Sequence, residues 1–475
     1  MKPNIKPIIY TMLAALTLSV TAYAQQNLRT AYFLDGYTYS YKFNPSFQGE
    51  RGFLAIPVLG KTGVGVESNM ALSSFLYPTG KGTLTTFLSP NVSADDFSGS
   101  LKEFNRMNIN VDIPVFAVGF YTGKLFHTID ISARADAGIG LPKSLFSFMK
   151  EGASDGVDKW DINNIGARAD ARLELAYGAS CRLFDFINVG ARLKMLVGVI
   201  SADLLMNNVN LRMTADEWSV SADGELLVNG PFDIDESLDF ESITYPASFE
   251  DLKNMEHSTG FAVDLGVSAD FLEYFTASAS VLDLGSIGWK QGFSAHTPSG
   301  AEPWRFTGFG EISHDGNNTS VEDQIDAMVD DLMTVFNLTK SDDHKPGRRP
   351  LGATAHLGLE ARMPFYERLS FGLLGTRRFD GAYSWTEGRI SANIAPANAF
   401  SASCSYAVST YGSSLGAAIN LHSDGLTFFA GLDSFLPLFN VTPQFIPVNR
   451  WNTNLTLGLN LTIGNYKGRF PKIVK

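Results

Sequence analysis

The feature that most constrains this chain is a strict two-residue alternation of apolar and polar side chains, repeated along most of its length. Over residues 128–140 the odd positions carry Ile or Ala, and the even positions carry mostly polar or charged residues. Similar runs cover 165–177, 187–197 and 454–463. Because successive side chains of a strand point to opposite faces, each run predicts a strand with one apolar and one polar side. The fold class predicted from these runs is all-β.

Two architectures accommodate such strands. A soluble sandwich buries its apolar faces in a core of bulky side chains, whereas an outer-membrane barrel turns them to lipid and lines a wet lumen with the polar faces. Here the apolar faces are rich in Ala, the polar faces carry charges, and the runs exceed the roughly five or six residues usual in soluble strands. Because lipid excludes open sheet edges, such strands must close into a ring. The sequence therefore predicts a transmembrane antiparallel up-and-down β-barrel in the outer membrane.

The connections between the runs support a barrel. Short turns are expected at 123–124, 183–185, 272–274, 364–368, 396–398 and 423–425. Most long connections alternate with them, at 73–106, 140–163, 200–258, 285–352 and 434–452, while 379–388 and 409–412 are shorter. Short periplasmic turns and long extracellular loops are typical of outer-membrane barrels. Six hairpins, or twelve strands, plus strands near 62–72 and 453–464 give about fourteen strands, although 200–258 could hold a further hairpin.

Aromatic residues cluster near the short turns, as expected for a girdle at the membrane surface. They are Tyr121, Phe126, Phe184, Phe186, Phe271, Phe275, Phe365, Tyr366 and Phe371.

The start of the chain predicts export. Lys2 and Lys6, the apolar run 8–21 and the sequence Ala22-Tyr23-Ala24 form a secretory signal peptide (1–24) with cleavage after Ala24. Residues 25–60 are then expected to form an N-terminal periplasmic or plug segment and 61–475 the barrel, in which the long extracellular loop 285–352 carries a short helix at 321–337. A second helix is expected at 142–150. No later apolar run reaches the ~18 residues of a transmembrane helix.

The candidate functional residues are charged side chains on the polar faces, which would line the lumen. They are Arg134, Asp136, Arg168, Asp170, Arg172, Glu174, Arg192, Lys194, His356, Glu360 and Arg362. Because both signs occur on neighbouring strands, the favoured interpretation is a cross-strand ion-pair network. The alternative is a charged constriction that selects solutes. For His356, solvation in the lumen is favoured over a ligand or proton-relay role.

No catalytic, metal or cofactor site is predicted, and the chain is expected not to be an enzyme. The G-x-S-x-G sequence at 412–416 lies between two alternating runs, not in the strand–turn–helix of a hydrolase. The sequence at 60–62 lacks the first Gly of a phosphate-binding loop, because Ala55 stands there. The seven histidines show no metal-site spacing. Cys181 and Cys404 fall on lipid-facing positions of distant strands, so free, buried thiols are expected.

Several short motifs carry a resemblance to known barrels. Residues 28–36, Asn44-Pro45-Ser46, 74–79 and 87–90 resemble a Bacteroidota outer-membrane barrel family of unknown function, over the whole mature chain. The Asn-Pro pair and residues 282–289 resemble, more distantly, the long-chain fatty-acid transporter superfamily, which includes barrels attached to the type IX secretion machinery. This second resemblance implies fourteen strands with an N-terminal plug, and it assigns no functional residue.

Two functional hypotheses follow. The first is passive uptake of a small apolar solute, which implies a mostly apolar pocket between the plug and the wall. The second is a scaffold or surface-assembly protein whose acidic loops, 233–251 and 322–343, bind a surface or secretion protein. A hydrolase lacks a nucleophile–base pair. The net charge of −12, or −14 without Lys2 and Lys6, argues against nucleic acid, so the expected contacts are outer-membrane lipid and one of these partners.

Overall fold

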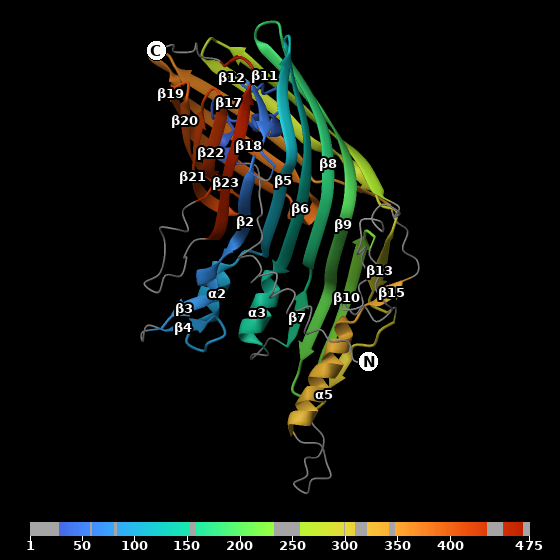
Figure 1. The fold of residues 1–475 in the computed structure, drawn as a ribbon. Helices are drawn as coiled ribbons and strands as arrows, with labels where there is room; N and C mark the ends of the chain where they lie inside the picture. Colours follow the sequence, from blue (N-terminus) through green and yellow to red (C-terminus); the bar gives the residue numbers. More distant parts are fainter. Residues whose placement is uncertain are drawn as a thin grey trace.

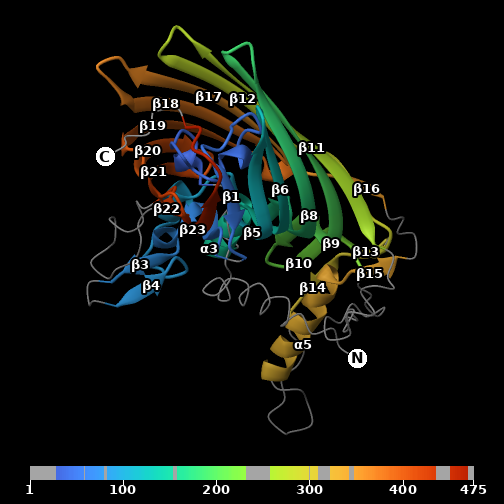
Figure 2. The ribbon, with the colours of Figure 1, turned by 45° about the horizontal axis from the view of Figure 1, so that its top comes forward.

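The antiparallel strands of the chain close into a barrel of fourteen strands (Figures 1 and 2). The computed structural model describes residues 28–57, 59–79, 83–152, 158–231, 257–298, 300–308, 321–341, 347–434 and 450–468. In ring order the strands are β2 (Thr62–Ala71), β5 (Phe104–Thr122), β6 (Leu125–Pro142), β8 (Ile165–Leu183), β9 (Ile187–Met213), β11 (Ser258–Phe271), β12 (Phe275–Gly288), β17 (Ala353–Met363), β18 (Tyr366–Phe379), β19 (Trp385–Ala397), β20 (Phe400–Ser409), β21 (Gly412–His422), β22 (Leu426–Leu432) and β23 (Arg450–Ile463). The ring closes where β23 pairs with β2, with Leu457 opposite Thr62. The predicted architecture and strand number are confirmed.

The alternation in the sequence separates an apolar outer face from a polar interior. On β8, Leu173 and Leu175 are 45% and 42% exposed, whereas the intervening Glu174 is 2% exposed. This is the arrangement of a membrane-embedded barrel, whose outer face meets lipid. Cys181 and Cys404 are free, as predicted, but the prediction that they are buried is wrong, because Cys181 is half-buried and Cys404 is exposed. No helix within the described residues is long and apolar enough to span a membrane.

The hairpin turns lie where the sequence predicts them, but the aromatic girdle is only partly formed. Phe184 and Phe365, at two of the turns, are strongly exposed, as a girdle requires. Phe126 instead points inward and is buried, with its ring centroid 4.8 Å from that of Tyr121. The Tyr121 hydroxyl donates to the Gly49 carbonyl at 2.6 Å. The girdle prediction is therefore wrong for these two residues, because the N-terminal segment offers them a partner inside the barrel.

The N-terminal segment lies inside the ring up to residue 51, and then enters the wall. It contains the 3₁₀ turns η2 (Arg29–Ala31) and η3 (Ser40–Lys42), followed by β1 (Gly52–Ala55). β1 pairs with β23 on one side and with β5 on the other. The predicted boundary at residue 60 is therefore several residues too late, since 52–55 already belong to the wall. The expected signal peptide (1–24) and the acidic loop 233–251 lie outside the described residues.

The long connections form a platform on the loop side of the barrel, at the bottom of Figure 1. Its elements are η4 (Leu72–Ser74), β3 (Leu76–Pro78), β4 (Leu84–Thr86), α2 (Ala94–Ser100), α3 (Lys143–Glu151), β7 (Lys159–Ile162), β10 (Trp218–Asn229), β13 (Gly292–His296), β14 (Trp304–Phe306), α5 (Val321–Met333), η6 (Thr334–Phe336), β15 (Thr339–Ser341) and β16 (Arg348–Pro350). Both predicted helices are confirmed, as α3 and α5. The 200–258 connection does hold a hairpin, formed by the extended β9 and by β10.

Candidate functional site

The N-terminal segment, residues 28–51, is called the plug below, and it contacts wall glycines. A Cβ atom at Gly190 on β9 would lie 2.0 Å from the Pro45 carbonyl oxygen. A Cβ atom at Gly266 on β11 would lie 2.0 Å from Oδ1 of Asn44. The same crowding occurs at Gly358 beside Tyr32, Gly372 beside Phe33, Gly416 beside Thr30 and Gly431 beside Leu28. The interior of the wall is thus shaped to the plug, since only glycine leaves room for it.

The Asn44-Pro45-Ser46 motif anchors the plug to β11 and β12. The Asn44 amide donates to the carbonyls of Val267 and Ala279, each at 3.2 Å. Ser46 donates its N–H and its hydroxyl to Asn44 Oδ1, at 2.9 and 2.8 Å. Its hydroxyl also shares a hydrogen bond of 3.1 Å with the Ser268 hydroxyl, which can donate to it. These bonds satisfy the polar groups that the motif buries, and so fix this turn of the plug against the wall.

A second anchor holds the start of the plug. Asp433 accepts hydrogen bonds from the backbone N–H of Arg29 at 2.9 Å and of Thr30 at 2.6 Å. The Arg29 guanidinium pairs with Glu67 at 2.6 Å and with Glu387 at 3.0 Å. All of these side chains are buried. The plug is therefore fastened to opposite parts of the wall by buried polar contacts, which are costly to break singly.

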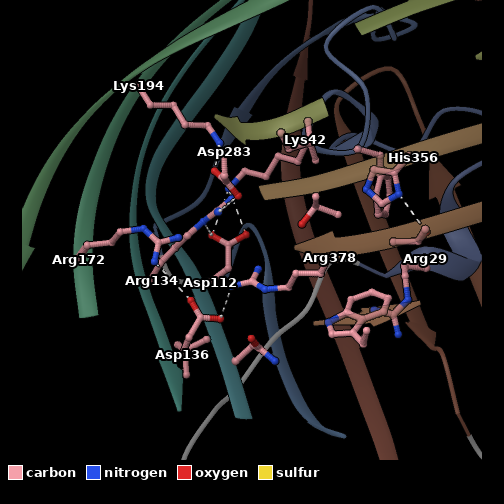
Figure 3. A pocket seen from close by; sticks show the side chains of 17 residues that line it. Arg29, Lys42, Asp112, Arg134, Asp136, Arg172, Lys194, Asp283, His356 and Arg378 are labelled. Carbon is pink, nitrogen blue, oxygen red and sulfur yellow. Dashed lines mark hydrogen bonds and ion pairs between the residues drawn. The ribbon is translucent and has the colours of Figure 1, made fainter. Parts of the chain in front are cut away.

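Between the anchors lies a buried ion-pair network, which we call the lumen network (Figure 3). Its members are Lys42, Lys61, Asp112, Asp130, Arg134, Asp136, Asp170, Arg172, Glu174, Arg192, Lys194, Asp264 and Asp283. Arg192 pairs with Asp130 at 2.6 Å and with Asp264 at 3.0 Å. Lys194 joins Asp264 at 2.8 Å to Asp283 at 2.5 Å. The network thus links β6, β9, β11 and β12 across the interior.

The plug contributes to the lumen network through η3. Lys42 pairs with Asp112 on β5 at 3.2 Å and with Asp130 on β6 at 3.7 Å. Lys61, just before β2, approaches the same Asp112 at 2.9 Å. Removal of the plug would leave the buried Asp112 and Asp130 with fewer cations, and buried charges need such partners.

A cavity of about 90 Å³ lies beside the network and against the plug. Arg29, Lys42 and Phe43 of the plug form part of its lining. A second cavity of about 200 Å³ adjoins it and shares Asp136, Arg172 and Arg378 with the first. The second cavity, which we call the vestibule, lies at the loop ends of β6, β8, β9 and β18. The two cavities lie next to each other between the loop side and the plug, and both have charged side chains in their lining; we call this row of cavities the polar path. Each cavity is large enough for ordered water.

The connection between β18 and β19 lies at the vestibule and reaches across the barrel to β5 and β8. We call residues 380–384 the latch loop; it contains η7 (Gly381–Tyr383). Arg168 on β8 donates to Asp380 at 2.5 Å, and its guanidinium stacks 4.2 Å from the centre of the Tyr383 ring. On β5, Arg106 donates to the Ser384 carbonyl at 2.7 Å. The latch loop is therefore held to the far side of the barrel.

The latch carboxylate is ionised more readily than an ordinary aspartate. Burial alone would raise the pKa of Asp380, but the hydrogen bond from Arg168 and the charges of Arg378 and Arg168 outweigh it and lower that pKa. The latch is therefore charged at neutral pH, and such charge-assisted bonds are the stronger ones.

A family model matches residues 45–433, most of the chain. The chain belongs to a family of unknown function, DUF5723. The resemblance to a barrel family of unknown function is thereby confirmed, while the assignment to Bacteroidota stays a prediction. No protein of curated function matches the chain by sequence.

Several solved barrels are similar over nearly the full chain. A TodX deletion mutant, a monoaromatic hydrocarbon channel, is 8% identical, with 93% of this chain and 96% of that chain covered and a TM-score of 0.42. The Ralstonia pickettii toluene transporter TbuX is 9% identical, with 94% of this chain and 96% of that chain covered and a TM-score of 0.42. A Pseudomonas aeruginosa FadL homologue is 11% identical, with 93% of this chain and 99% of that chain covered and a TM-score of 0.41. Such distant likenesses assign neither residue nor solute to this family member.

The structure brings most of the sequence-predicted residues of this family member together, and separates a few. Seven lie in the lumen network, namely Arg134, Asp136, Asp170, Arg172, Glu174, Arg192 and Lys194. Arg168 on β8 lines the vestibule and pairs with Asp380 of the latch loop at 2.5 Å. Glu360 is buried on the inner face of β17. Arg362 instead lies at the periplasmic turn, where it donates to the Glu273 carbonyl at 3.1 Å, so it lines neither cavity.

His356 lies in the cavity wall, but its surroundings are those of a packed side chain. Its Nδ1 shares a hydrogen bond of 3.0 Å with the Thr376 hydroxyl. Its ring lies against the plug, with centroids 5.8 Å from Tyr32 and 6.1 Å from Phe43. Solvation in an open lumen, the favoured interpretation from sequence, therefore gives way to contact with the plug.

The sequence prediction missed four carboxylates of the network, Asp112, Asp130, Asp264 and Asp283, and two of its lysines, Lys42 and Lys61. Asp112, Asp130 and Asp264 occupy inward positions of strands, so the same alternation could have found them. Asp283 could not be found in this way, because it lies in a β-bulge with φ of 60°, where the alternation of β12 breaks. Lys42 and Lys61 come from irregular chain and carry no periodic signal.

Proposed function

We propose that this protein is an outer-membrane transporter that carries a small solute past a movable plug. The observation that carries the proposal is the polar path formed by the vestibule and the inner cavity, which ends on Arg29, Lys42 and Phe43 of the plug. A path that leads from the loop side to a separate internal segment is expected if that segment controls passage. The barrel supplies the wall, and the latch loop and the plug supply two closures in series.

The lining of this path favours a polar solute. The lysines and arginines around the inner cavity each pair with at least one carboxylate, for example Arg172 with Asp170 at 2.6 Å. Paired charges present many hydrogen-bonding groups but little net charge, so they suit a neutral or zwitterionic solute better than a simple ion. The apolar solute of the sequence hypothesis implies a mostly apolar pocket between plug and wall, whereas the cavity there is charged. We therefore propose a polar solute, with an apolar one as the alternative.

Transport on this proposal requires the plug to move, which a disulfide lock can test. The Ser46 and Ser268 hydroxyls lie 3.1 Å apart, so Ser46→Cys with Ser268→Cys should join the plug to β11. The background carries Cys181→Ser and Cys404→Ser, which removes the native thiols. We expect proteoliposomes that contain this reduced double-cysteine variant to swell in isotonic sugar or amino-acid solutions. The swelling should stop when the variant is oxidised and return when it is reduced.

The control for the lock joins two wall strands. The hydroxyls of Thr427 on β22 and Thr462 on β23 lie 3.2 Å apart, so Thr427→Cys with Thr462→Cys gives a disulfide that spares the plug. Oxidation of this variant should leave swelling unchanged. Equal swelling of the oxidised plug-locked protein, or no swelling of the reduced protein in any solute, would contradict the transporter proposal.

A scaffold function is the second candidate, and α5 favours it. This acidic helix on the platform leaves Ile325 and Val329 exposed by 42% and 44%. Ile325→Asp with Val329→Asp should then remove a protein that co-purifies after gentle detergent extraction, whereas Leu84→Asp on β4 should not. A barrel that purifies alone would count against the scaffold.

A further inference from the structure

A large apolar hollow lies on the outer face of the barrel. Its volume is about 620 Å³, and it spans β11, β12, β17, β18 and β19. Outward side chains that line it include Val267, Ala269, Ala277, Ala279, Leu357 and Leu373. This volume falls within the roughly 300–1,000 Å³ of small-molecule sites, and the residues that line it carry no charge.

The hollow exists because the outward positions there have little side-chain volume. Ala269 on β11 pairs with Ala277 on β12, and Gly375 on β18 pairs with Gly388 on β19. Between these pairs Leu357 and Leu373 project outward, 68% and 54% exposed. The outer face therefore forms a concave apolar surface at this place, with leucines to pack against whatever fills it.

The plug braces the wall behind the hollow. The Tyr32 hydroxyl shares a hydrogen bond of 3.0 Å with the hydroxyl of Ser278, a residue in the floor of the hollow. A Cβ atom at Gly358, another floor residue, would lie 2.8 Å from the Tyr32 ring. A shift of β12 or β17 that closes the hollow would therefore have to break or displace these contacts with Tyr32.

We infer that this hollow binds an acyl chain of a membrane phospholipid. The inference rests on the proposed membrane location, because lipid is the medium in contact with the outer face of a barrel within the membrane. Lipid chains are as apolar as leucine, so burial gives no hydrophobic gain. The preference comes instead from van der Waals contact, since a chain in a concave site touches wall atoms on several sides.

Filling the hollow tests the inference. Ala279→Leu and Gly375→Leu add apolar volume on the lipid side, a change that a membrane strand tolerates. Ala133→Leu on β6 and Ala171→Leu on β8 make matched changes on the outer face away from the hollow. Each protein is placed in nanodiscs of phosphatidylethanolamine and phosphatidylglycerol and released in a native mass spectrometer. We expect one phospholipid retained by the wild type and both controls, and its loss from the filled variants.

Other outcomes overturn the inference. They are a wild type that retains no lipid, equal retention by filled and control variants, or retention of a free fatty acid in place of a phospholipid. A wild-type barrel that does not enter nanodiscs overturns the membrane location as well, so failure of the two proposals can be told apart. If Gly375→Leu does not fold, Ala277→Val makes a smaller filling change, and retention equal to wild type in both Ala277→Val and Ala279→Leu overturns the inference.

Discussion

Single glycines on the inner wall decide how closely the plug can approach. Gly190 and Gly266 face the backbone or side chain of the Asn44-Pro45 turn at distances that exclude any Cβ atom. Because these neighbours are held by the Asn44 and Ser46 hydrogen bonds, they cannot give way alone. A substitution at such a glycine must therefore displace the turn as a whole.

Gly190→Ala tests this at the residue scale. Its new Cβ atom would meet the Pro45 carbonyl oxygen at 2.0 Å, so we expect the variant to lose about 1–3 kcal/mol of unfolding free energy by overpacking. Urea unfolding of the barrel in detergent measures the loss. In Gly388→Ala the new atom meets nothing within 4 Å, and this control should unfold like the wild type. Equal stability of the two variants would mean that the plug turn is not fixed.

How far the site can be predicted from sequence also depends on the residue. Arg172 and Lys194 were found because they stand at inward positions of long regular strands. Asp283 was missed because a bulge shifts the alternation by one place, and Lys42 because a plug segment has no period to read. The pairing partner of a buried charge can thus escape notice even where the charge itself is predicted.

At the scale of elements, the latch loop lies at the vestibule, and in the proposed transporter it would control access to it. Its hold on β5 and β8 depends on Arg106 and Arg168, so it joins strands far apart in the ring. The latch loop is also short, so it cannot move far from the vestibule without loss of these contacts.

Asp380→Asn should weaken the latch. Loss of the charge-assisted bonds from Arg168 and Arg378 is expected to shift the loop towards opening by about 1–2 kcal/mol, or about fivefold to thirtyfold. The expected result is faster swelling of proteoliposomes by the same solutes. Arg377→Gln, at an exposed hydrogen bond to Thr386, is the control and should not change the rate.

The same carboxylate sets a pH dependence. Because the pKa of Asp380 is lowered in the folded protein, its stabilising effect is complete above the ordinary value of 3.8 and is lost as the pH falls through the lowered pKa. Swelling of the wild type should therefore stay constant from neutral pH to about pH 5, and rise only in stronger acid. A rise near neutral pH would show that another group holds the loop.

Elements differ in how well their sequences reveal them. The long wall strands and their turns are predictable, because alternation persists over many residues and the turns are short. The platform strands β13 to β16 are too short to show a period. They form because β13 and β14 pair with β10, β15 pairs with β13, and β16 pairs with β12. β1 was assigned to the plug for the same reason.

At the scale of the whole molecule, the plug is part of the folded barrel and the platform is an addition to it. Deletion of residues 28–47 should abolish the compact, heat-modifiable band of the folded barrel in gel electrophoresis, because Asp112 and Asp433 would lose buried partners. Replacement of 321–336, which contains α5 and η6, by a Gly-Ser linker should leave that band intact. A folded band without the plug would show that the lumen tolerates its absence.

The closure of the ring around the plug has a consequence for biogenesis. The plug is made first, yet the wall around it is complete only when β23 pairs with β2, and these strands lie near opposite ends of the chain. Joining such distant segments is entropically costly and slow. We expect the interior glycines and charges to stand in an open, curved sheet during that interval, where a plug that docks early would act as a template for the later strands.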